Sequence, residues 1–250
     1  EGDTSQTVRL RSVAPKAMGN IILHFRCNPG SHHLAAEAGL RVLREGGNAI
    51  EAMVAAAATI TVVYPHMNAL GGDNFWLIHE AGEVTGIDAC GAAAMAANRA
   101  LYTDLKHRMI PARGPLAALT GAGAPSGWEL ALRISANRGG LMPLSRLMED
   151  AIYHAENGIP VSCSLNKNIV AKADELQAIP GFSEIFLPAG EPPLVGDRLV
   201  FSALAETLRR LGSQGIDDFY NGDLATSMAS DLKNLGSPIG RDDLARHRAR

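Results

Sequence analysis

The sequence predicts an α/β fold in which helices pack in layers around a small sheet. Three observations predict it. Residues 49–63 form an apolar run with a single charge, Glu51; residues 75–88 resemble two short strands joined by a turn; and the second half is mostly amphipathic at helical spacing. A helix that is apolar on all sides is normally buried. The first run should therefore lie inside the domain.

A pair of helices is predicted first. Residues 33–45 alternate apolar and charged side chains at helical spacing, and glycines 46–47 should end that helix. Asn48 is a preferred N-cap, and Glu51 can return a hydrogen bond to the Asn48 amide, which makes a capping box. The second helix should start at residue 49. Its four alanines, 55–58, leave room for a close neighbour.

A hairpin is predicted next. Residues 75–78 form a short aromatic and branched strand, residues 80–83 a turn, and residues 84–88 a second strand. Because the first strand is almost continuously apolar, we expect it to be buried on both faces. Polar residues lie at the two ends of the hairpin, where chemistry is most naturally placed. They are His66, Asn68, Asp73, Asn74 and Asp88.

The second half is predicted to be mostly helical. Residues 114–128 should form a short apolar strand and a glycine-rich corner, with Ser126 capping the next helix and Glu129 at the reciprocal position. A region rich in proline and glycine, 179–196, is predicted to be a surface loop. The remaining helices are expected at residues 143–157, 165–177, 202–211 and 223–235.

The composition argues against nucleic-acid binding, a membrane span and a metal site. The chain has 23 basic and 26 acidic residues, a net charge of -3, and no basic face of the kind that nucleic-acid binding requires. The run 49–63 is too short for a bilayer, which needs ~20 residues. Three scattered cysteines make neither a disulfide framework nor a metal knuckle, so we expect a reducing compartment, no metal and no cofactor. Residues 1–6 are acidic and polar, unlike a signal peptide, and we expect a cytoplasmic protein.

Several motifs allow two interpretations. Gly121, Gly123 and Gly127 are spaced GxGxxxG with a proline inside, which favours a tight structural turn over a dinucleotide loop. The adjacent histidines 32–33 favour a helix-start region over a metal site. His66 is equally consistent with a satisfied core histidine and a functional one. For Asp73 and Asp88, paired carboxylates and hairpin-end residues that accept backbone hydrogen bonds are equally plausible.

A family resemblance rests on longer segments. Residues 34–78, LAAEAGLRVLREGGNAIEAMVAAAATITVVYPHMNALGGDNFWLI, closely resemble the opening of the large subunit in the γ-glutamyltranspeptidase family of N-terminal nucleophile hydrolases. The resemblance continues at residues 114–128, 158–162, 196–222 and 242–248. It leaves residues 1–30 as an unassigned leader and residues 31–250 as a large-subunit part that is incomplete at its C-terminus.

The resemblance implies a fold and a mechanism. It implies an αββα sandwich and a longer precursor that cleaves itself before a threonine, which then heads a small subunit and forms an acyl-enzyme. Nothing in this chain matches that cleavage segment, so no catalytic residue is expected here and the chain alone should be inert. The implied partners are the small subunit and a small amide substrate, with a pair of heterodimers as a further possibility.

One departure from the family pattern bears on the substrate. The resemblance implies substrate-binding roles for Asn68, Asp73, Asp88, Cys90 and Gly91. In typical members the strand ends Asp-Phe-Arg-Glu and that arginine holds the glutamyl carboxylate, whereas residues 88–91 here are Asp-Ala-Cys-Gly. A thiol cannot replace a bidentate guanidinium. The GIDACGA segment at 86–92 instead resembles the oxamate amidohydrolase branch.

Three functions are therefore kept open. The leading one is the N-terminal portion of an amide hydrolase acting on a small carboxylated amide such as oxamate. The alternatives are a γ-glutamyltransferase, glutathione hydrolase or cephalosporin-acylase-like enzyme, and an inactive fragment that lacks the nucleophile. The sequence downstream of residue 250 distinguishes an enzyme, with its threonine-led segment, from a fragment.

Overall fold

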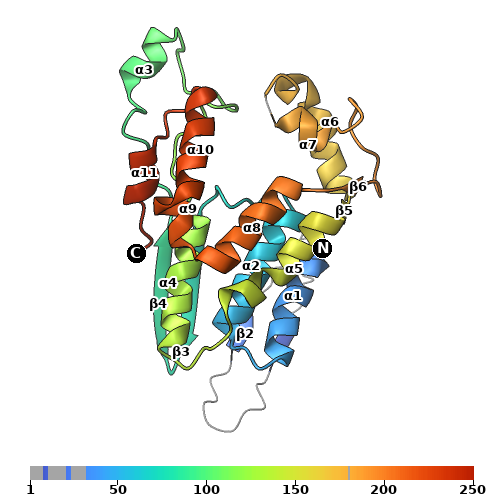
Figure 1. Ribbon diagram of the computed structural model, residues 1–250, viewed down its shortest axis with the longest axis vertical. Helices are drawn as coiled ribbons and strands as arrows, with labels where there is room; N and C mark the ends of the chain where they lie inside the picture. The colour runs from blue at the N-terminus through green and yellow to red at the C-terminus, as the bar shows by residue number, and fades with distance from the viewer. Residues whose placement is uncertain (1–7, 11–20, 24–31, 180) are drawn as a thin grey trace, which may run out of the picture.

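The computed structural model describes residues 8–10, 21–23, 32–179 and 181–250, and this part of the chain is mostly helical with few strands (Figure 1). The strands are β1 (Val8–Leu10), β2 (Ile21–Leu23), β3 (Asn74–Glu80), β4 (Glu83–Ala89), β5 (Ile159–Pro160) and β6 (Arg198–Leu199). The helices are α1 (His33–Arg44), α2 (Ala49–Val63), α3 (Arg99–Asp104), α4 (Ala124–Ala136), α5 (Leu144–Asn157), α6 (Cys163–Leu176), α7 (Phe182–Phe186), α8 (Ser202–Gln214), α9 (Asp217–Asn221), α10 (Asp223–Asn234) and α11 (Arg241–Arg246).

The predicted helical pair is confirmed. Asn48 Oδ1 accepts the Glu51 N–H at 3.1 Å, and the Asn48 N–H donates to Glu51 Oε2 at 2.7 Å, which is the capping box. Glu51 is buried and its other oxygen accepts the Met142 N–H at 2.8 Å. Helix α1 packs closely on α2 because the facing residues are small: a Cβ on Gly39 would lie 2.9 Å from the Ala52 carbonyl oxygen.

A row of helices forms the main core. Helices α1, α2, α5 and α8 lie side by side, with α2 between α1 and α5, and α8 on the far side of α5 (Figure 1). The apolar faces of α2, α5 and α8 supply its fully buried side chains, including Val54, Val62, Leu147, Met148 and Leu208. The buried-helix prediction for residues 49–63 is therefore correct.

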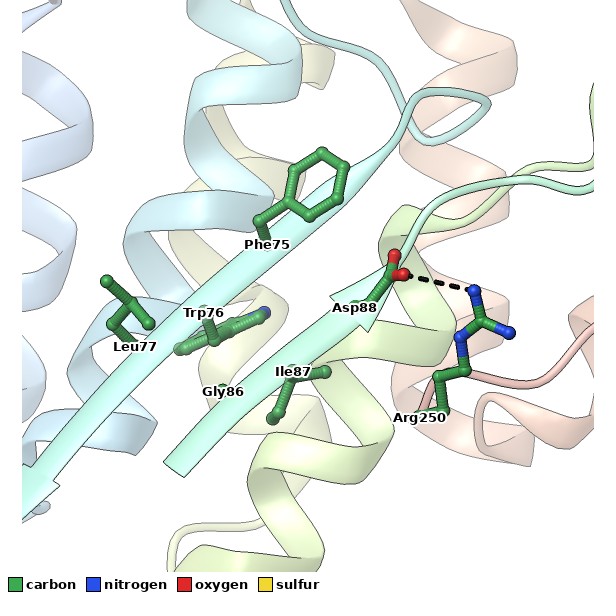
Figure 2. Close-up of a pocket in the computed structure, with 7 residues that line it drawn as sticks. All are labelled: Phe75, Trp76, Leu77, Gly86, Ile87, Asp88 and Arg250. Atoms are coloured by element: carbon green, nitrogen blue, oxygen red, sulfur yellow. Dashed lines mark hydrogen bonds and ion pairs between the residues drawn. The ribbon is translucent and has the colours of Figure 1, made fainter. Parts of the chain in front are cut away.

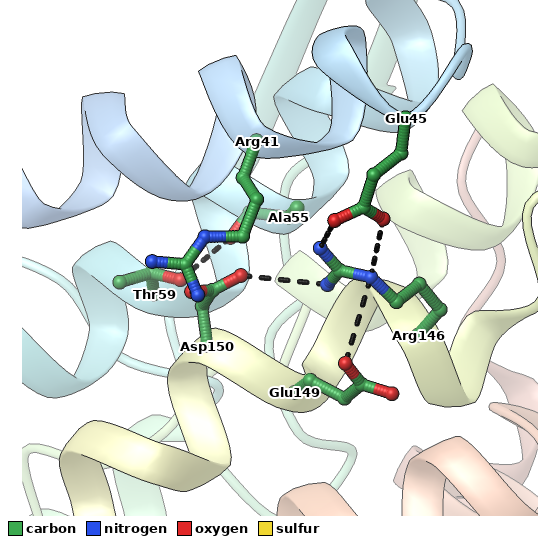
Figure 3. Close-up of polar contacts among 7 residues, drawn as sticks. All are labelled: Arg41, Glu45, Ala55, Thr59, Arg146, Glu149 and Asp150. Carbon is green, nitrogen blue, oxygen red and sulfur yellow. Dashed lines mark hydrogen bonds and ion pairs between the residues drawn. The ribbon is translucent and has the colours of Figure 1, made fainter.

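An ion-pair cluster joins the C-terminal end of α1 to the first half of α5 (Figure 3). Asp150, almost buried on α5, accepts Arg41 Nη1 at 2.9 Å and Arg146 Nη1 at 3.4 Å. Arg146 also forms a bidentate pair with Glu45, both contacts at 2.6 Å, and lies 3.5 Å from Glu149. The hydrogen bonds from Arg146 lower the pKa of Glu45. The cluster orients α5 against the C-terminal end of α1.

The β3–β4 hairpin stands beside α4. Its strands pair antiparallel with Asn74 opposite Ala89 and Glu80 opposite Glu83, and Ala81 and Gly82 both have positive φ in the two-residue turn. This confirms the predicted hairpin. Helix α4 packs on one face of it, through Trp76 and the buried Ile87.

The prediction that the first strand is buried on both faces is wrong. Burial along β3 alternates: Phe75 is 67% exposed and Leu77 is 84% exposed, while Trp76 between them is half-buried and packs against the main core. Val84, on the same outward face of β4, is 63% exposed. In the described part of the chain, the apolar composition of this strand thus reflects one covered face and one bare face.

Three further details correct the sequence interpretation. No regular strand forms at residues 114–120 among the described residues; there is a turn and one isolated bridge between Ala93 and Thr120. Gly123, not Ser126, is the N-cap of α4. The predicted loop 179–196 contains the short helix α7.

The predicted leader, 1–30, lies outside the described residues except for β1 and β2. No helix in the described regions is both long and apolar enough to cross a membrane.

Candidate functional site

The candidate site forms where β4 ends. Asp73 Oδ1 accepts the Gly91 N–H at 2.9 Å, and Asp88 Oδ1 accepts the Cys90 N–H at 2.9 Å. Both carboxylates therefore accept backbone hydrogen bonds at the ends of the hairpin, which is the second of the two interpretations above. Asp88 is the outward-facing residue opposite Phe75. The structure thus brings Asp73 together with Asp88, Cys90 and Gly91, and the two carboxylates hold the backbone turn that follows β4.

Asn68, the fifth expected site residue, is not joined to this turn. It follows α2, and its backbone N–H donates to the Tyr64 carbonyl at 3.1 Å. No hydrogen bond in the described regions connects it to the other four. Nearby His66 packs its ring 4.2 Å from that of Tyr64 and has two buried ring nitrogens without partners in the described structure. Burial lowers the pKa of His66.

The glycine-rich corner is a packing device. A Cβ on Gly91 would lie 1.8 Å from the Gly121 carbonyl oxygen, and a Cβ on Gly123 would lie 1.8 Å from the Ala89 carbonyl oxygen. The first amides of α4, on Gly123 and Ala124, donate to the Gly72 carbonyl at 2.9 and 2.8 Å. Because these amides are already bonded, the start of α4 does not offer the phosphate cradle of a dinucleotide loop.

The segment after α11 returns to β4 and completes the site. Asp88 N–H donates to the Arg250 carbonyl at 2.6 Å and Arg250 N–H donates to the Asp88 carbonyl at 2.9 Å, as in a hydrogen-bonded antiparallel pair. One residue earlier, the Ala249 N–H donates to Ser126 Oγ at 2.6 Å. Ser126 N–H is in turn bonded to Tyr220 Oη at 3.0 Å. Helix α4 therefore fixes the position of this segment against the hairpin.

A hollow of about 650 Å³ lies over the outward face of the hairpin, next to this segment (Figure 2). Arg250 reaches from beyond β4 toward Asp88, with Nη2 3.4 Å from Asp88 Oδ2. The rest of the lining is apolar or glycine. The lining residues are Phe75, Trp76, Leu77, Gly86, Ile87, Asp88 and Arg250.

The charges of the site follow from these contacts. The Cys90 backbone N–H, followed by the Arg250 guanidinium, lowers the pKa of Asp88, so this carboxylate is ionised at neutral pH. Loss of hydration and the nearby Asp73 carboxylate raise the pKa of the Cys90 thiol, so the thiol is neutral there. Among the described residues, no group of three or more histidines, cysteines and carboxylates could hold a metal ion.

Sequence reasoning missed Arg250, Ser126 and His247 as parts of this region. Arg250 lies 162 positions from Asp88 in the sequence, and no local pattern marks such a pairing. Ser126 was expected to cap a helix, and it instead accepts the Ala249 N–H. His247 follows the short helix α11 directly, but its burial is known only from the structure, so the sequence carries no signal of this docked segment.

The burial of His247 against Tyr220 predicts that this contact is sensitive to acid. It is 7% exposed, its ring packs 5.4 Å from that of Tyr220, and its buried Nε2 has no partner in the described structure. Burial, and then Arg248, lowers the pKa of His247, while Asp73 and Asp88 oppose the shift. The neutral imidazole is favoured in the fold, so its contribution is complete above the unfolded pKa of about 6.5 and is lost as the pH falls below it.

His247→Phe should therefore lose less stability than the parent protein between about pH 7 and pH 5. The measurement is the urea midpoint across this pH range. His107→Phe, an exposed position near α3, is the control and should follow the parent. Identical pH slopes for the parent and His247→Phe would show that protonation of His247 does not loosen the segment.

The comparison with known proteins decides the family. The sequence profile described as gamma-glutamyltranspeptidase matches residues 35–250. The chain belongs to the gamma-glutamyltranspeptidase family. Within it, the chain is 54% identical over 221 residues to an oxamate amidohydrolase proenzyme of Klebsiella pneumoniae, covering 88% of this chain and 42% of that protein. It is 36% identical over 219 residues to a glutathione hydrolase-like proenzyme of Bacillus subtilis, covering 87% of this chain and 41% of that protein.

Solved structures of the family agree in fold. The gamma-glutamyltranspeptidase of Helicobacter pylori superimposes with a TM-score of 0.80 at 32% identity, over 88% of this chain and 63% of that chain. The chain spans less than half the length of the two curated relatives above. The two curated relatives are named as an amidohydrolase proenzyme and a glutathione hydrolase-like proenzyme. Because the chain covers only part of each, the activity and partners of the whole protein are given below as proposals.

Proposed function

We propose that this chain is the N-terminal, large-subunit part of a self-processing amide hydrolase that cleaves a small carboxylated amide such as oxamate through a threonine acyl-enzyme. The observation that carries the proposal is the end of β4. There the residues that follow Asp88 are Ala89, Cys90 and Gly91, small and uncharged at neutral pH, within a sequence 54% identical to that of an oxamate amidohydrolase proenzyme.

The physical argument concerns size and charge. A γ-glutamyl group carries an α-amine and an α-carboxylate on a three-carbon arm, and recognising that carboxylate in two-point fashion requires a guanidinium. Cys90 supplies neither charge nor fork. Oxamate has its carboxylate directly beside the amide, so the anion and the reacting carbonyl lie within one small site. This argues against a glutathione hydrolase, while the choice of oxamate rests on the 54% identical relative.

The exposed apolar face of the hairpin supports the proposal that a second subunit binds there. Phe75, Leu77 and Val84 present apolar surface to water on one side of β3–β4 while α4 covers the other. A sheet with an apolar outward face and a free strand edge is a site for further β-structure. In our proposal the small subunit from the same precursor covers this face, which produces the αββα sandwich and brings the threonine close to the end of β4. Two such heterodimers can pair.

The alternatives make different predictions. A cephalosporin-acylase-like enzyme needs room for a long acyl chain, and an inactive fragment never self-cleaves.

Free thiols at Cys90 and Cys163 are consistent with a reducing compartment, and we place the enzyme in the cytoplasm on that ground.

The deciding experiment uses the full-length protein. It should cleave itself into two chains, visible on a denaturing gel, and release ammonia from oxamate with a kcat/KM at least about 100-fold above that for a γ-glutamyl anilide. Cys90→Arg should not improve oxamate turnover. Efficient γ-glutamyl transfer from glutathione by the parent enzyme would overturn the assignment, and absence of self-cleavage would favour the fragment.

A further inference from the structure

The edge of β4 that faces away from β3 carries the segment after α11. Asp88 and Arg250 exchange two backbone hydrogen bonds, at 2.6 and 2.9 Å, as a hydrogen-bonded antiparallel pair does. Asp88 lies opposite Phe75 of β3, so both of these bonds point to the other edge of β4 (Figure 2). Arg250 therefore occupies the position of the first residue of a third strand.

The rest of this edge has no partner strand in the part of the chain that the structure describes. Backbone groups alternate between the two edges of a strand, so the N–H and C=O of Gly86 point to the same edge as those of Asp88. Among the described residues, Gly86 makes no backbone hydrogen bond outside the hairpin. Residues 83–86 are all exposed, and they include no proline, lysine or bulge, the features with which proteins protect a free edge. This edge is therefore suited to pairing with another strand.

We infer that in the full-length protein the chain beyond Arg250 runs back along β4 as a third, antiparallel strand, in which the residue two places beyond Arg250 is hydrogen-bonded to Gly86. The inference rests on the proposed function in one respect, that this chain is part of a longer precursor. Its direction follows from the antiparallel pair, because each step forward from Arg250 is a step backward along β4, from Asp88 to Ile87 to Gly86.

Covalent connection favours this segment over other strands. The residues that follow Arg250 are held at the edge by the pair with Asp88, so their effective concentration there exceeds that of a strand from the small subunit or from a second copy. The third strand widens the sheet whose outward face the small subunit covers in our proposal.

Ser126 on α4 fixes the register of this strand. Its Oγ accepts the Ala249 N–H at 2.6 Å, and its own N–H donates to Tyr220 Oη at 3.0 Å. Ser126 is buried, and α4 packs on β4. The Ala249 N–H is thus held toward α4, which leaves the next residue, Arg250, to pair with the edge of β4.

Hydrogen exchange on the full-length protein tests the pairing. The Gly86 N–H should exchange at least about 100-fold more slowly than in an unstructured peptide, because a strand hydrogen bond must open before exchange occurs. Ser126→Ala leaves the Ala249 N–H without its acceptor and should speed exchange at Gly86 by about threefold to tenfold, the effect of one lost hydrogen bond. Ser213→Ala is the matched control, because Ser213 is exposed on α8 and its hydroxyl bonds the Arg210 carbonyl of the same helix. It should leave exchange at Gly86 unchanged.

A cross-link identifies the segment that covers the edge. The full-length protein would carry Cys90→Ala and Cys163→Ala, which remove the two exposed thiols. Gly86→Cys should form a disulfide with a cysteine introduced two residues beyond Arg250, because residues opposite each other in a hydrogen-bonded pair have Cα atoms about 5.5 Å apart. A Cβ at position 86 meets no atom closer than 4.0 Å. Thr85→Cys is the matched control and should not form the link, since neighbouring side chains of a strand lie on opposite faces.

Slow exchange at Gly86 together with the disulfide supports the third strand. Fast exchange at Gly86 in the parent protein overturns the inference. Slow exchange without the disulfide overturns it as well, because a strand of the small subunit or of a second copy then covers the edge. Equal exchange rates for Ser126→Ala and Ser213→Ala would remove the role of Ser126. Neither readout needs turnover, so failure to hydrolyse oxamate would overturn the proposed function and leave the strand in place.

Discussion

Gly123→Ala should lower the free energy of unfolding of the full-length protein by about 3 kcal/mol. The added Cβ would lie 1.8 Å from the Ala89 carbonyl oxygen and 2.9 Å from its carbonyl carbon, both of which are backbone atoms. Relief requires β4 to separate from the start of α4, which breaks the bonds from Gly123 and Ala124 to the Gly72 carbonyl. The same movement displaces the turn at residues 88–91, so self-cleavage and turnover should fall as well.

The measurement is the urea midpoint, with oxamate turnover as a second readout. Gly71→Ala is the control, because a Cβ on Gly71 meets nothing within 4 Å and its φ is not in the left-handed region. It should leave stability within about 0.5 kcal/mol. An unchanged midpoint for Gly123→Ala would mean that the corner does not pack against β4 as tightly as described.

Leu77→Ala should cost the full-length protein about 2 to 5 kcal/mol, the range for removing a buried leucine side chain. The side chain is 84% exposed in this chain, on the outward face of β3 between Phe75 and His79. The large cost follows only if a second sheet covers that face, as the proposed sandwich requires. The prediction thus tests the architecture through a residue whose surroundings among the described residues give no reason for a large effect.

Leu141→Ala is the matched control for Leu77→Ala. Leu141 is 91% exposed in the connection between α4 and α5 and is not part of the hairpin. Its substitution should change the free energy of unfolding by no more than about 0.5 kcal/mol. Equal, small effects at Leu77 and Leu141 would show that the hairpin face remains in water in the whole protein and would remove the support for the sandwich.

Local chemistry was sufficient for the elements that depend on nearby residues. The capping box at Asn48 and Glu51 involves residues three positions apart, and the hairpin turn at Ala81 and Gly82 lies between two adjacent strand-forming runs. The buried state of α2 follows from its uniform apolar composition. The longer helices α5, α6, α8 and α10 were predicted for the same reason, because a helix-length period is a local property.

Burial on the hairpin and the composition of the site depended on tertiary structure. The same apolar strand is compatible with two covered faces or one, and only the position of α4 shows that Phe75 and Leu77 are bare in this chain. Gly121, Gly123 and Gly127 were expected to make a turn, but the need for glycine at position 123 comes from its contact with the Ala89 backbone of β4, which no spacing rule contains.

The sequence by itself determined the family, the helical pair, the hairpin and the loss of the expected arginine at Cys90. Only the tertiary structure decided that the guanidinium beside Asp88 belongs to Arg250. The physical reason is that this pairing is made by backbone hydrogen bonds between segments 162 positions apart, and such bonds carry no side-chain signature. Any residue type can form them, so the fold alone determines which side chain they bring to the site.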